Sequence, residues 1–143
     1  TAYKEDSEIL IESFLDGKEV SVGVIQYKGE TKVLPITEIV SENDFFDYEA
    51  KYNGKSDEIT PARVSDLEKD LVQTLSKKIY KLLNLKGMVR MDFILKNQRA
   101  YLIEVNTIPG LSEESIIPQQ SKSYGMSLKE LFSLSLMNMF KND

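Results

Sequence analysis

The sequence predicts an α+β fold with a mainly antiparallel sheet flanked by helices. In the first 40 residues, short segments with alternating apolar residues follow one another through tight turns, as in an antiparallel meander. Helical periodicity begins only after residue 60, and a second pair of strand-like segments follows it. The length of 143 residues is that of one typical domain, so we expect residues 1–143 to form a single unit.

The first part of the chain contains three expected strands, at residues 9–15, 19–27 and 31–40. Asp-Gly and Lys-Gly pairs supply the turns between them. Residues 41–61 lose this periodicity and are rich in Asp, Asn, Gly and aromatic residues. A loop this long in a compact domain is usually functional or disordered, and the aromatic residues argue against disorder.

The second part is expected to begin with a helix that Pro61 opens and that ends before Gly87. The remaining expected elements are two strands joined by a tight turn, a short helix and a final amphipathic helix, at residues 88–95, 99–105, 113–124 and 127–140. Ser127 and Glu130 form a capping-box pattern at the start of the final helix.

The composition excludes several kinds of chemistry. The chain has no cysteine and no histidine, so disulfides, thiolate catalysis and the commonest zinc ligand are excluded. A net charge of -5 argues against a nucleic-acid surface. We find no apolar run of the roughly 18 to 20 residues that span a bilayer and no signal peptide, so we expect a soluble cytoplasmic protein without a membrane partner. Because the chain starts at Thr1 without Met, we expect it to be part of a longer protein.

Two expected strands each carry a pair of polar residues at strand spacing. Arg90 and Asp92 lie two apart on one strand, and Glu104 and Asn106 lie two apart on the next. A hairpin with an odd-numbered turn, closing residue 96 on residue 100, places Asp92 opposite Glu104 and Arg90 opposite Asn106. An even turn places the partners on opposite faces. We adopt the hypothesis that the turn is odd and that the four groups converge.

Such a convergence would create a site with only oxygen ligands. Two carboxylates and an amide oxygen suit Mg²⁺ far better than Zn²⁺, and Mg²⁺ commonly binds one or two carboxylates together with substrate phosphates. A nucleotide is therefore the natural co-ligand. The alternative is a surface ion pair, such as Asp92 with Arg90, on a solvated sheet face.

Four motifs along the chain resemble one known family. RMDFIL, YLIEVNTIPGLSEESIIP, FFDYEAKYNG and LIESFLDGKEVSVGV together resemble the D-alanine--D-alanine ligases of the ATP-grasp superfamily, from about residue 9 to the last helix. The resemblance implies the C-terminal part of an ATP-grasp domain, with helices on one side of the sheet. It also implies ligation of two D-alanines with ATP through an acyl phosphate for the peptidoglycan precursor. The full-length protein is implied to be a homodimer.

The resemblance assigns roles around the polar hairpin. Asp92, Glu104 and Asn106 match the family's ligands for two magnesium ions, with Mn²⁺ as an alternative. Arg90 matches the arginine that steadies the acyl phosphate and the tetrahedral intermediate. The backbone N–H of Gly110 matches the oxyanion donor, a role that also allows Gly110 to be an ordinary turn residue.

Further roles are implied for two segments on either side of the helix that begins near residue 61. Ser115 and the N–H of Ile116 match the pair that receives the carboxylate of the second D-alanine, and the alternative is an N-cap serine. Lys51 and Tyr52 match the tip of a loop that closes over the γ-phosphate and excludes water. The alternative there is a charged, exposed loop.

The first strand segment matches the nucleotide-binding part of the family. Glu12 to Leu15 resemble the strand that holds adenine, with the backbone of Leu15 at the base edge and Phe14 packed on the base or in the core. Glu19 resembles the acid that binds the ribose hydroxyls. Without the resemblance, Glu12 and Glu19 read as solvent-facing strand residues.

Parts of the family's machinery have no counterpart in this chain. These are the N-terminal domain and the subdomain with the glycine-rich loop and phosphate-binding lysines, so we expect the chain to be inactive alone. Three alternatives stay open at this point: a ligase for D-lactate or D-serine, another ATP-grasp carboxylate-amine ligase or carboxylase, and a non-catalytic nucleotide-binding or interaction domain. The last is expected to lose one of the four hairpin residues, and all four are present.

Overall fold

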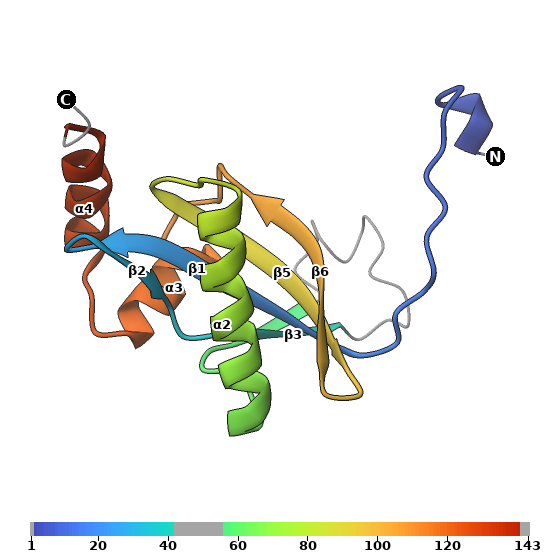
Figure 1. Cartoon of the computed structure of the whole chain (residues 1–143), viewed down its shortest axis with the longest axis horizontal. Coiled ribbons are helices and arrows are strands. Elements are labelled where there is room, and N and C mark those ends of the chain that lie inside the picture. The colour runs from blue at the N-terminus through green and yellow to red at the C-terminus, as the bar shows by residue number, and fades with distance from the viewer. Residues whose placement is uncertain (1, 42–55, 141–143) are drawn as a thin grey trace.

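The computed structural model describes residues 2–41 and 56–140. Its described strands form one antiparallel sheet in the order β4-β3-β1-β5-β6, with β2 also paired to β1. Figure 1 shows this sheet with its helices. The strands are β1 (Lys18–Tyr27), β2 (Glu30–Val33), β3 (Thr37–Ser41), β4 (Ser56–Ile59), β5 (Met88–Lys96) and β6 (Arg99–Asn106). The α+β class and the antiparallel sheet are confirmed.

Helices cover both faces of the sheet. A short 3-10 helix, η1 (Ala2–Lys4), precedes α2 (Asp66–Leu82), α3 (Ile116–Ser123) and α4 (Leu128–Phe140). In Figure 1, α2 lies in front of the sheet and α3 behind it. Because side chains alternate along β1, Val20, Val22 and Val24 pack in the core with α2. Ile25 packs in a second core with α3 and α4. The expectation of helices on one side only is wrong.

The segment 9–15 is not a strand. It has no regular secondary structure, and Leu10 and Ile11 are more than 80% exposed. Both edges of the strand that follows are occupied, because β1 pairs with β2 and β3 on one edge and with β5 on the other. The expected hairpin between residues 9–15 and β1 therefore has no edge to form on.

The expected strand at 31–40 is divided into β2 and β3. Pro35 lies in the gap between them, and proline has no N–H for a sheet hydrogen bond. The strand β4 lies within the expected loop 41–61 and was missed because its sequence, Ser-Asp-Glu-Ile, has no apolar alternation. Its hydrogen bonds to β3 make it a strand.

The helix α2 begins at Asp66 rather than at Pro61. Ser65 is its N-cap: the hydroxyl of Ser65 accepts a hydrogen bond from the N–H of Glu68 at 3.3 Å, and the Glu68 carboxylate accepts one from the N–H of Ser65 at 2.9 Å. The predicted capping box at Ser127 and Glu130 is confirmed at the start of α4.

A buried acidic side chain stabilises the fold at β3. Glu38 accepts hydrogen bonds from the side chain of Arg63 at 2.8 and 3.0 Å and lies 3.5 Å from the Lys18 ammonium. These hydrogen bonds, with the N–H and charge of Arg63 and the charge of Lys18, outweigh burial and lower the pKa of Glu38 from 4.5 to about 2.

We expect Glu38→Gln to destabilise the protein at neutral pH. The folded-state pKa is depressed, so this contribution is present above the unfolded pKa near 4.5 and is lost as pH falls towards 2. The shift sets an upper limit of about 3 kcal/mol. We expect roughly 1–2 kcal/mol, because the Arg63 side chain is 63% exposed and solvent screens the pair. Urea unfolding at pH 7 and pH 2.5 measures this contribution, and the control is Glu30→Gln, because the Glu30 side chain on β2 is 75% exposed. A difference between wild type and Glu38→Gln that is the same at both pH values would contradict this account.

Candidate active site

The four polar residues of the β5–β6 hairpin converge on one face, as predicted. Arg90 lies opposite Asn106, and Asp92 lies opposite Glu104. The expectation of an odd turn is wrong: Lys96 pairs with Arg99 across two residues that both have positive φ, as in a type I′ turn.

A β-bulge restores the register that the even turn would have lost. Phe93 pairs with Leu102 while Asp92 pairs with Glu104, so Ile103 is an extra residue on β6. The bulge shifts the β6 residues that follow Ile103 by one position relative to β5. Without it, Glu104 and Asn106 would point to the opposite face from Asp92 and Arg90.

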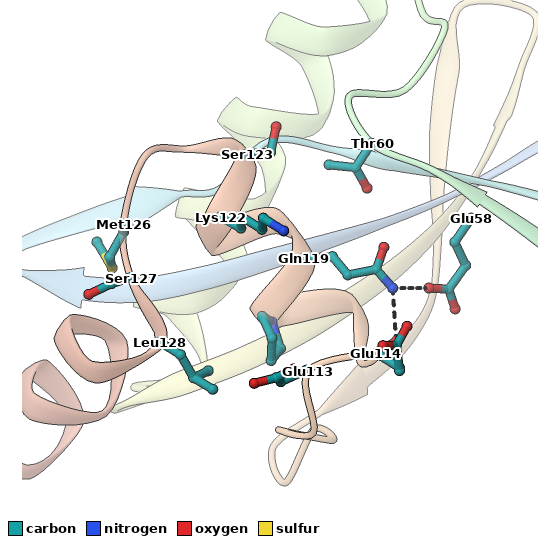
Figure 2. Close-up of a pocket in the computed structure, with 11 residues that line it drawn as sticks. Glu58, Thr60, Glu113, Glu114, Gln119, Lys122, Ser123, Met126, Ser127 and Leu128 are labelled. Atoms are coloured by element: carbon teal, nitrogen blue, oxygen red, sulfur yellow. Dashed lines mark hydrogen bonds between the residues drawn. The ribbon is translucent and has the colours of Figure 1, made fainter.

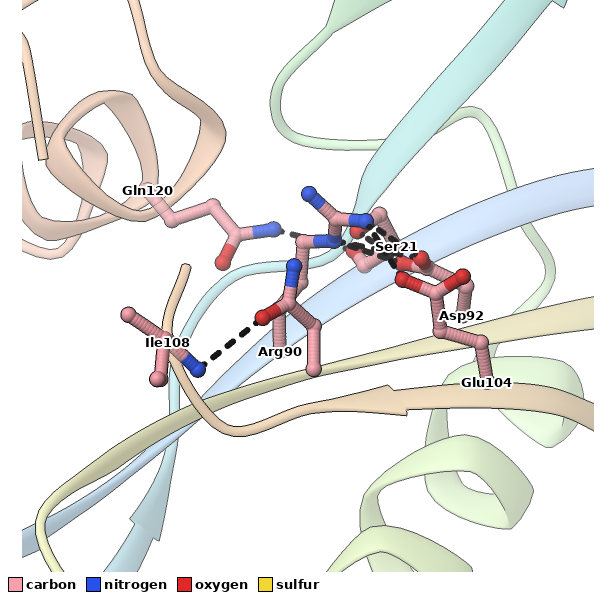
Figure 3. A network of polar contacts seen from close by, with 7 residues as sticks. Ser21, Arg90, Asp92, Glu104, Ile108 and Gln120 are labelled. Atoms are coloured by element: carbon pink, nitrogen blue, oxygen red, sulfur yellow. Dashed lines mark hydrogen bonds and ion pairs between the residues drawn. The ribbon is translucent and has the colours of Figure 1, made fainter. Parts of the chain in front are cut away.

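Arg90 is the centre of the converging group (Figure 3). Its guanidinium donates to both carboxylate oxygens of Asp92, at 2.7 to 3.1 Å, and to Glu104 at 3.2 Å. Burial by itself lowers the pKa of Arg90, but the hydrogen bonds and charge of Asp92 and the charges of Glu104 and Glu58 outweigh it and raise the pKa. Arg90 is therefore a fixed cation, with its side chain 20% exposed.

Asp92 is held from the neighbouring strand β1 by a residue that sequence reasoning missed. Ser21 lies opposite Asp92 on β1, and its hydroxyl donates to Asp92 at 2.6 Å. Ser21 is 2% exposed. A serine in a strand otherwise rich in valine was the available signal, because a buried hydroxyl needs a hydrogen-bond partner.

Asn106 lies where β6 ends. Its side-chain oxygen accepts a hydrogen bond from the N–H of Ile108 at 3.0 Å, which fixes the turn into the Pro109-Gly110 segment. Within the part of the chain that the structure describes, no three Asp, Glu, His or Cys side chains gather as metal ligands. The carboxylates of Asp92 and Glu104 instead both contact the guanidinium of Arg90.

A pocket of about 250 Å³ brings together four of the predicted residues, Arg90, Gly110, Ser115 and Ile116. They line it together with Glu58. Gly110 lies so close to α3 that a Cβ atom there would be 2.7 Å from the Ser115 hydroxyl oxygen. The absence of a side chain at Gly110 therefore leaves room for the Ser115 hydroxyl, whereas the backbone φ of Gly110 is not one that favours glycine.

Ser115 occupies the N-cap position of α3 but does not cap it. Its backbone is extended, at φ -77° and ψ 152°, and its hydroxyl makes no capping hydrogen bond. The hydroxyl instead lies 2.8 Å from that of Ser112. The first helical residues, Ile116 and Ile117, also line the pocket. A helix N-terminus has N–H groups without intrahelical partners and favours anions, so this end of the pocket suits a carboxylate.

Glu58 of β4 is a second residue that sequence reasoning missed, because it was placed in a loop. Its carboxylate accepts a hydrogen bond from Gln119 at 3.0 Å. Burial raises the pKa of Glu58, while this hydrogen bond and the positive charge of Arg90 oppose the rise. Figure 2 shows Glu58 and Gln119 at the edge of a larger pocket, of about 800 Å³, beside α3. That pocket contains none of the predicted site residues, whereas four of them line the smaller one.

The remaining predicted residues lie elsewhere. Glu12 and Phe14 are exposed on the N-terminal segment, Phe14 at 69%, and Leu15 is half-buried there. Glu19 lies on β1 two residues before Ser21 and therefore on the same face of the sheet. Lys51 and Tyr52 lie outside the described residues.

None of the described helices combines the length and apolar character needed to cross a bilayer.

The fold defines a class of protein. The structure superposes on a D-alanine--D-alanine ligase from Bacillus anthracis complexed with ATP, with a TM-score of 0.78 and 24% identity, over 98% of this chain and 44% of that one. A second structure of the ligase from this organism gives a TM-score of 0.77 at 28% identity, over 97% of this chain and 45% of that one. The fold is the C-terminal part of an ATP-grasp domain.

Sequence comparison then gives the family. The model described as D-ala D-ala ligase C-terminus matches residues 1–136, so the chain belongs to that family. It is 64% identical over 132 residues to the D-alanine--D-alanine ligase of Flavobacterium johnsoniae, covering 92% of this chain and 41% of that protein. It is 54% identical over 136 residues to that of Christiangramia forsetii, covering 95% and 42%. The chain thus spans less than half the length of these relatives.

Proposed function

We propose that this chain is the C-terminal part of a ligase that joins two D-alanines to D-alanyl-D-alanine with ATP, through an acyl phosphate, for peptidoglycan precursor synthesis. One observation carries the proposal: Arg90 contacts the carboxylates of Asp92 and Glu104 and also lines a pocket with Gly110 and the start of α3. A cation, an oxyanion donor and an anion site adjacent to one another suit acyl transfer from a phosphate.

The proposed metal ligands are Asp92, Glu104 and Asn106, for two Mg²⁺ ions with Mn²⁺ as an alternative. Their all-oxygen chemistry fits such ions. When bound with ATP, the ions neutralise the charge of the triphosphate. Ser21 holds one oxygen of Asp92, which orients the carboxylate before any cation arrives.

Arg90 and Gly110 are proposed to act on the reacting carbonyl. The guanidinium of Arg90 is fixed by Asp92 and Glu104, so its charge is already in place when negative charge develops on the acyl phosphate and on the tetrahedral intermediate. The N–H of Gly110 is proposed as the donor to the oxyanion. Both residues line the same pocket.

The second D-alanine is proposed to bind through its carboxylate at the start of α3. Ser115 supplies a hydroxyl that is not used for capping, and Ile116 supplies a backbone N–H. This arrangement holds the substrate's carboxylate while its amine approaches the acyl carbon. Lys51 and Tyr52 are proposed to close over the γ-phosphate and exclude water.

The adenine and ribose are proposed to bind along the N-terminal segment and the start of β1, through Glu12, Phe14, Leu15 and Glu19. The ring of Phe14 is 69% exposed, and the face of an aromatic ring can stack on a base. For the complete protein we also propose a cytoplasmic location, where ATP is available, and a homodimer.

A D-alanine:D-serine ligase is the second candidate. VanG D-Ala:D-Ser ligase from Enterococcus faecalis matches with a TM-score of 0.71 at 29% identity, over 86% of this chain and 36% of that one. Ser115 and Ile116 contact only a carboxylate in our proposal, and D-alanine and D-serine share that group. Groups outside this pocket must therefore decide between D-alanine and D-serine as the second substrate.

The test is product formation by the complete protein with ATP, Mg²⁺ and a panel of D-alanine, D-serine and D-lactate. We expect ADP release that depends on D-alanine, with D-alanyl-D-alanine as the main product by mass spectrometry. The 143-residue chain alone is expected to give no turnover. Turnover by the short chain, or no ADP release by the complete protein with any of the three substrates, would refute the proposal.

A further inference from the structure

We propose that Gln120 is a positioning residue: it locks α3, which carries Ser115 and Ile116, onto the strand β1 whose Ser21 holds Asp92. It would thereby set the position of the anion pocket relative to the oxygen ligands. The catalytic meaning of this inference rests on the proposed function, whereas its structural part does not.

Gln120 is fully buried, and its side-chain amide makes three hydrogen bonds. The amide nitrogen donates to the carbonyl oxygen of Ser21 and to the hydroxyl of Thr37, each at 2.9 Å. The amide oxygen accepts from the N–H of Gly23 at 2.7 Å. Both N–H hydrogens of the amide are therefore used, and Figure 3 shows Gln120 reaching from α3 towards Ser21.

These bonds fill a gap in the sheet. The N–H of Leu34 still donates to the carbonyl of Gly23 at 2.9 Å, but Pro35, the next residue, has no N–H and separates β2 from β3. The amide of Gln120 bonds β1 at this break, to the Ser21 carbonyl and the Gly23 N–H. The side-chain amide of Gln120 thus makes the two hydrogen bonds to β1 that the backbone of a neighbouring strand would otherwise make.

The close approach of α3 to β1 depends on glycine. A Cβ atom at Gly23 would lie 2.8 Å from the amide oxygen of Gln120 and 3.3 Å from a side-chain carbon of Ile117. Ile117 is 1% exposed and adjoins Ile116 at the helix start. The beginning of α3 and its Gln120 are therefore both held at a fixed distance from β1.

A continuous route connects this contact to the candidate catalytic groups. Gln120 bonds the main chain of Ser21, the Ser21 hydroxyl bonds Asp92 at 2.6 Å, and Asp92 bonds Arg90. Gln120 touches neither Asp92 nor the pocket itself in any of these contacts. Its effect on the reaction must therefore be indirect, which makes it a positioning residue and not a catalytic one.

The experiment is a double-mutant cycle in the complete protein with Gln120→Leu and Ser21→Ala, and Gln73→Leu on α2 as the matched control. We expect Ser21→Ala to raise the Mg²⁺ concentration for half-maximal activity about tenfold, as loss of a group that orients a metal ligand does. We expect Gln120→Leu to do the same and also to raise the KM for the second D-alanine, with Gln73→Leu unchanged. The two effects on Mg²⁺ dependence are expected to be less than multiplicative, because they share one route.

A readout without turnover separates this inference from the proposed function. Hydrogen exchange of ligand-free protein is expected to be faster in Gln120→Leu than in Gln73→Leu, both in β5 and at the start of α3. If wild type is inactive but this exchange pattern holds, the proposed function fails and the positioning role stands. If wild type is active and Ser21→Ala leaves the Mg²⁺ dependence unchanged, the route to Asp92 is refuted. If Gln120→Leu does not fold, the effect of Ser21→Ala on the Mg²⁺ dependence decides whether the route to Asp92 holds.

Discussion

Replacing Asp92 by Asn in the complete protein is expected to abolish most of the ligase activity. The substitution keeps the size of the side chain but removes the negative charge of one of the two carboxylates that converge on β5 and β6. A metal ion supplies several kcal/mol of stabilisation to the charge that develops in phosphoryl transfer. If Asp92→Asn loses about 3 kcal/mol of this transition-state stabilisation, kcat decreases roughly 100-fold. Steady-state ADP release across a Mg²⁺ titration measures it.

The Mg²⁺ dependence distinguishes a metal ligand from a residue that only pairs with Arg90. If Asp92 binds the cation, the half-saturating Mg²⁺ concentration rises in Asp92→Asn, and excess Mg²⁺ or Mn²⁺ restores part of the activity. Asp70→Asn, on the exposed surface of α2, is the control and is expected to behave as wild type. A kcat that falls while the Mg²⁺ dependence stays the same would mean that Asp92 acts only by holding Arg90.

Replacing Arg90 by Gln is expected to reduce kcat by about 10²- to 10³-fold, the effect typical of losing one preorganised group that stabilises an oxyanion. We expect the KM for ATP to change little, because Arg90 lies in the pocket with Gly110 and Ser115. Arg90→Lys keeps the charge but loses the planar fork that now contacts Asp92 and Glu104. It is expected to recover only part of the activity.

The same hairpin provides the control for Arg90. Arg99 follows the turn, is exposed and lies far along the hairpin from the pocket, so Arg99→Gln is expected to leave kcat within about twofold of wild type, as most surface substitutions do. Equal activities of the two variants would show that Arg90 has no role in the chemistry. The contacts of Arg90 would then be only those of a structural ion pair.

The convergence of the hairpin residues was predictable because it depends on a pattern with period two. Arg90 with Asp92, and Glu104 with Asn106, each share a face in any strand. The route to their convergence was not predictable. Nothing in the sequence distinguishes an odd turn from an even turn followed by a bulge at Ile103, because both give the same pairing near the site.

The supporting network was hidden from sequence reasoning for a different reason. Gln120 lies 99 residues from its partner Ser21 in the chain, and its role arises from a break in the sheet at Pro35. Such a contact depends on which face of the sheet α3 covers, and we expected all helices on one face. Glu58 was missed because β4 has only one apolar residue and is held by pairing with β3.

The most direct test of the central claim is a crystal structure of the complete protein with ATP, Mg²⁺ and D-alanine. We expect Asp92, Glu104 and Asn106 to coordinate Mg²⁺ at about 2.1 Å, and the Arg90 guanidinium and Gly110 N–H to face the reacting carboxylate. The carboxylate of the second D-alanine is expected at Ser115 and Ile116. Mg²⁺ bound by other residues, with Arg90 still paired to Asp92 and Glu104 as it is here and no substrate in the pocket, would contradict the account.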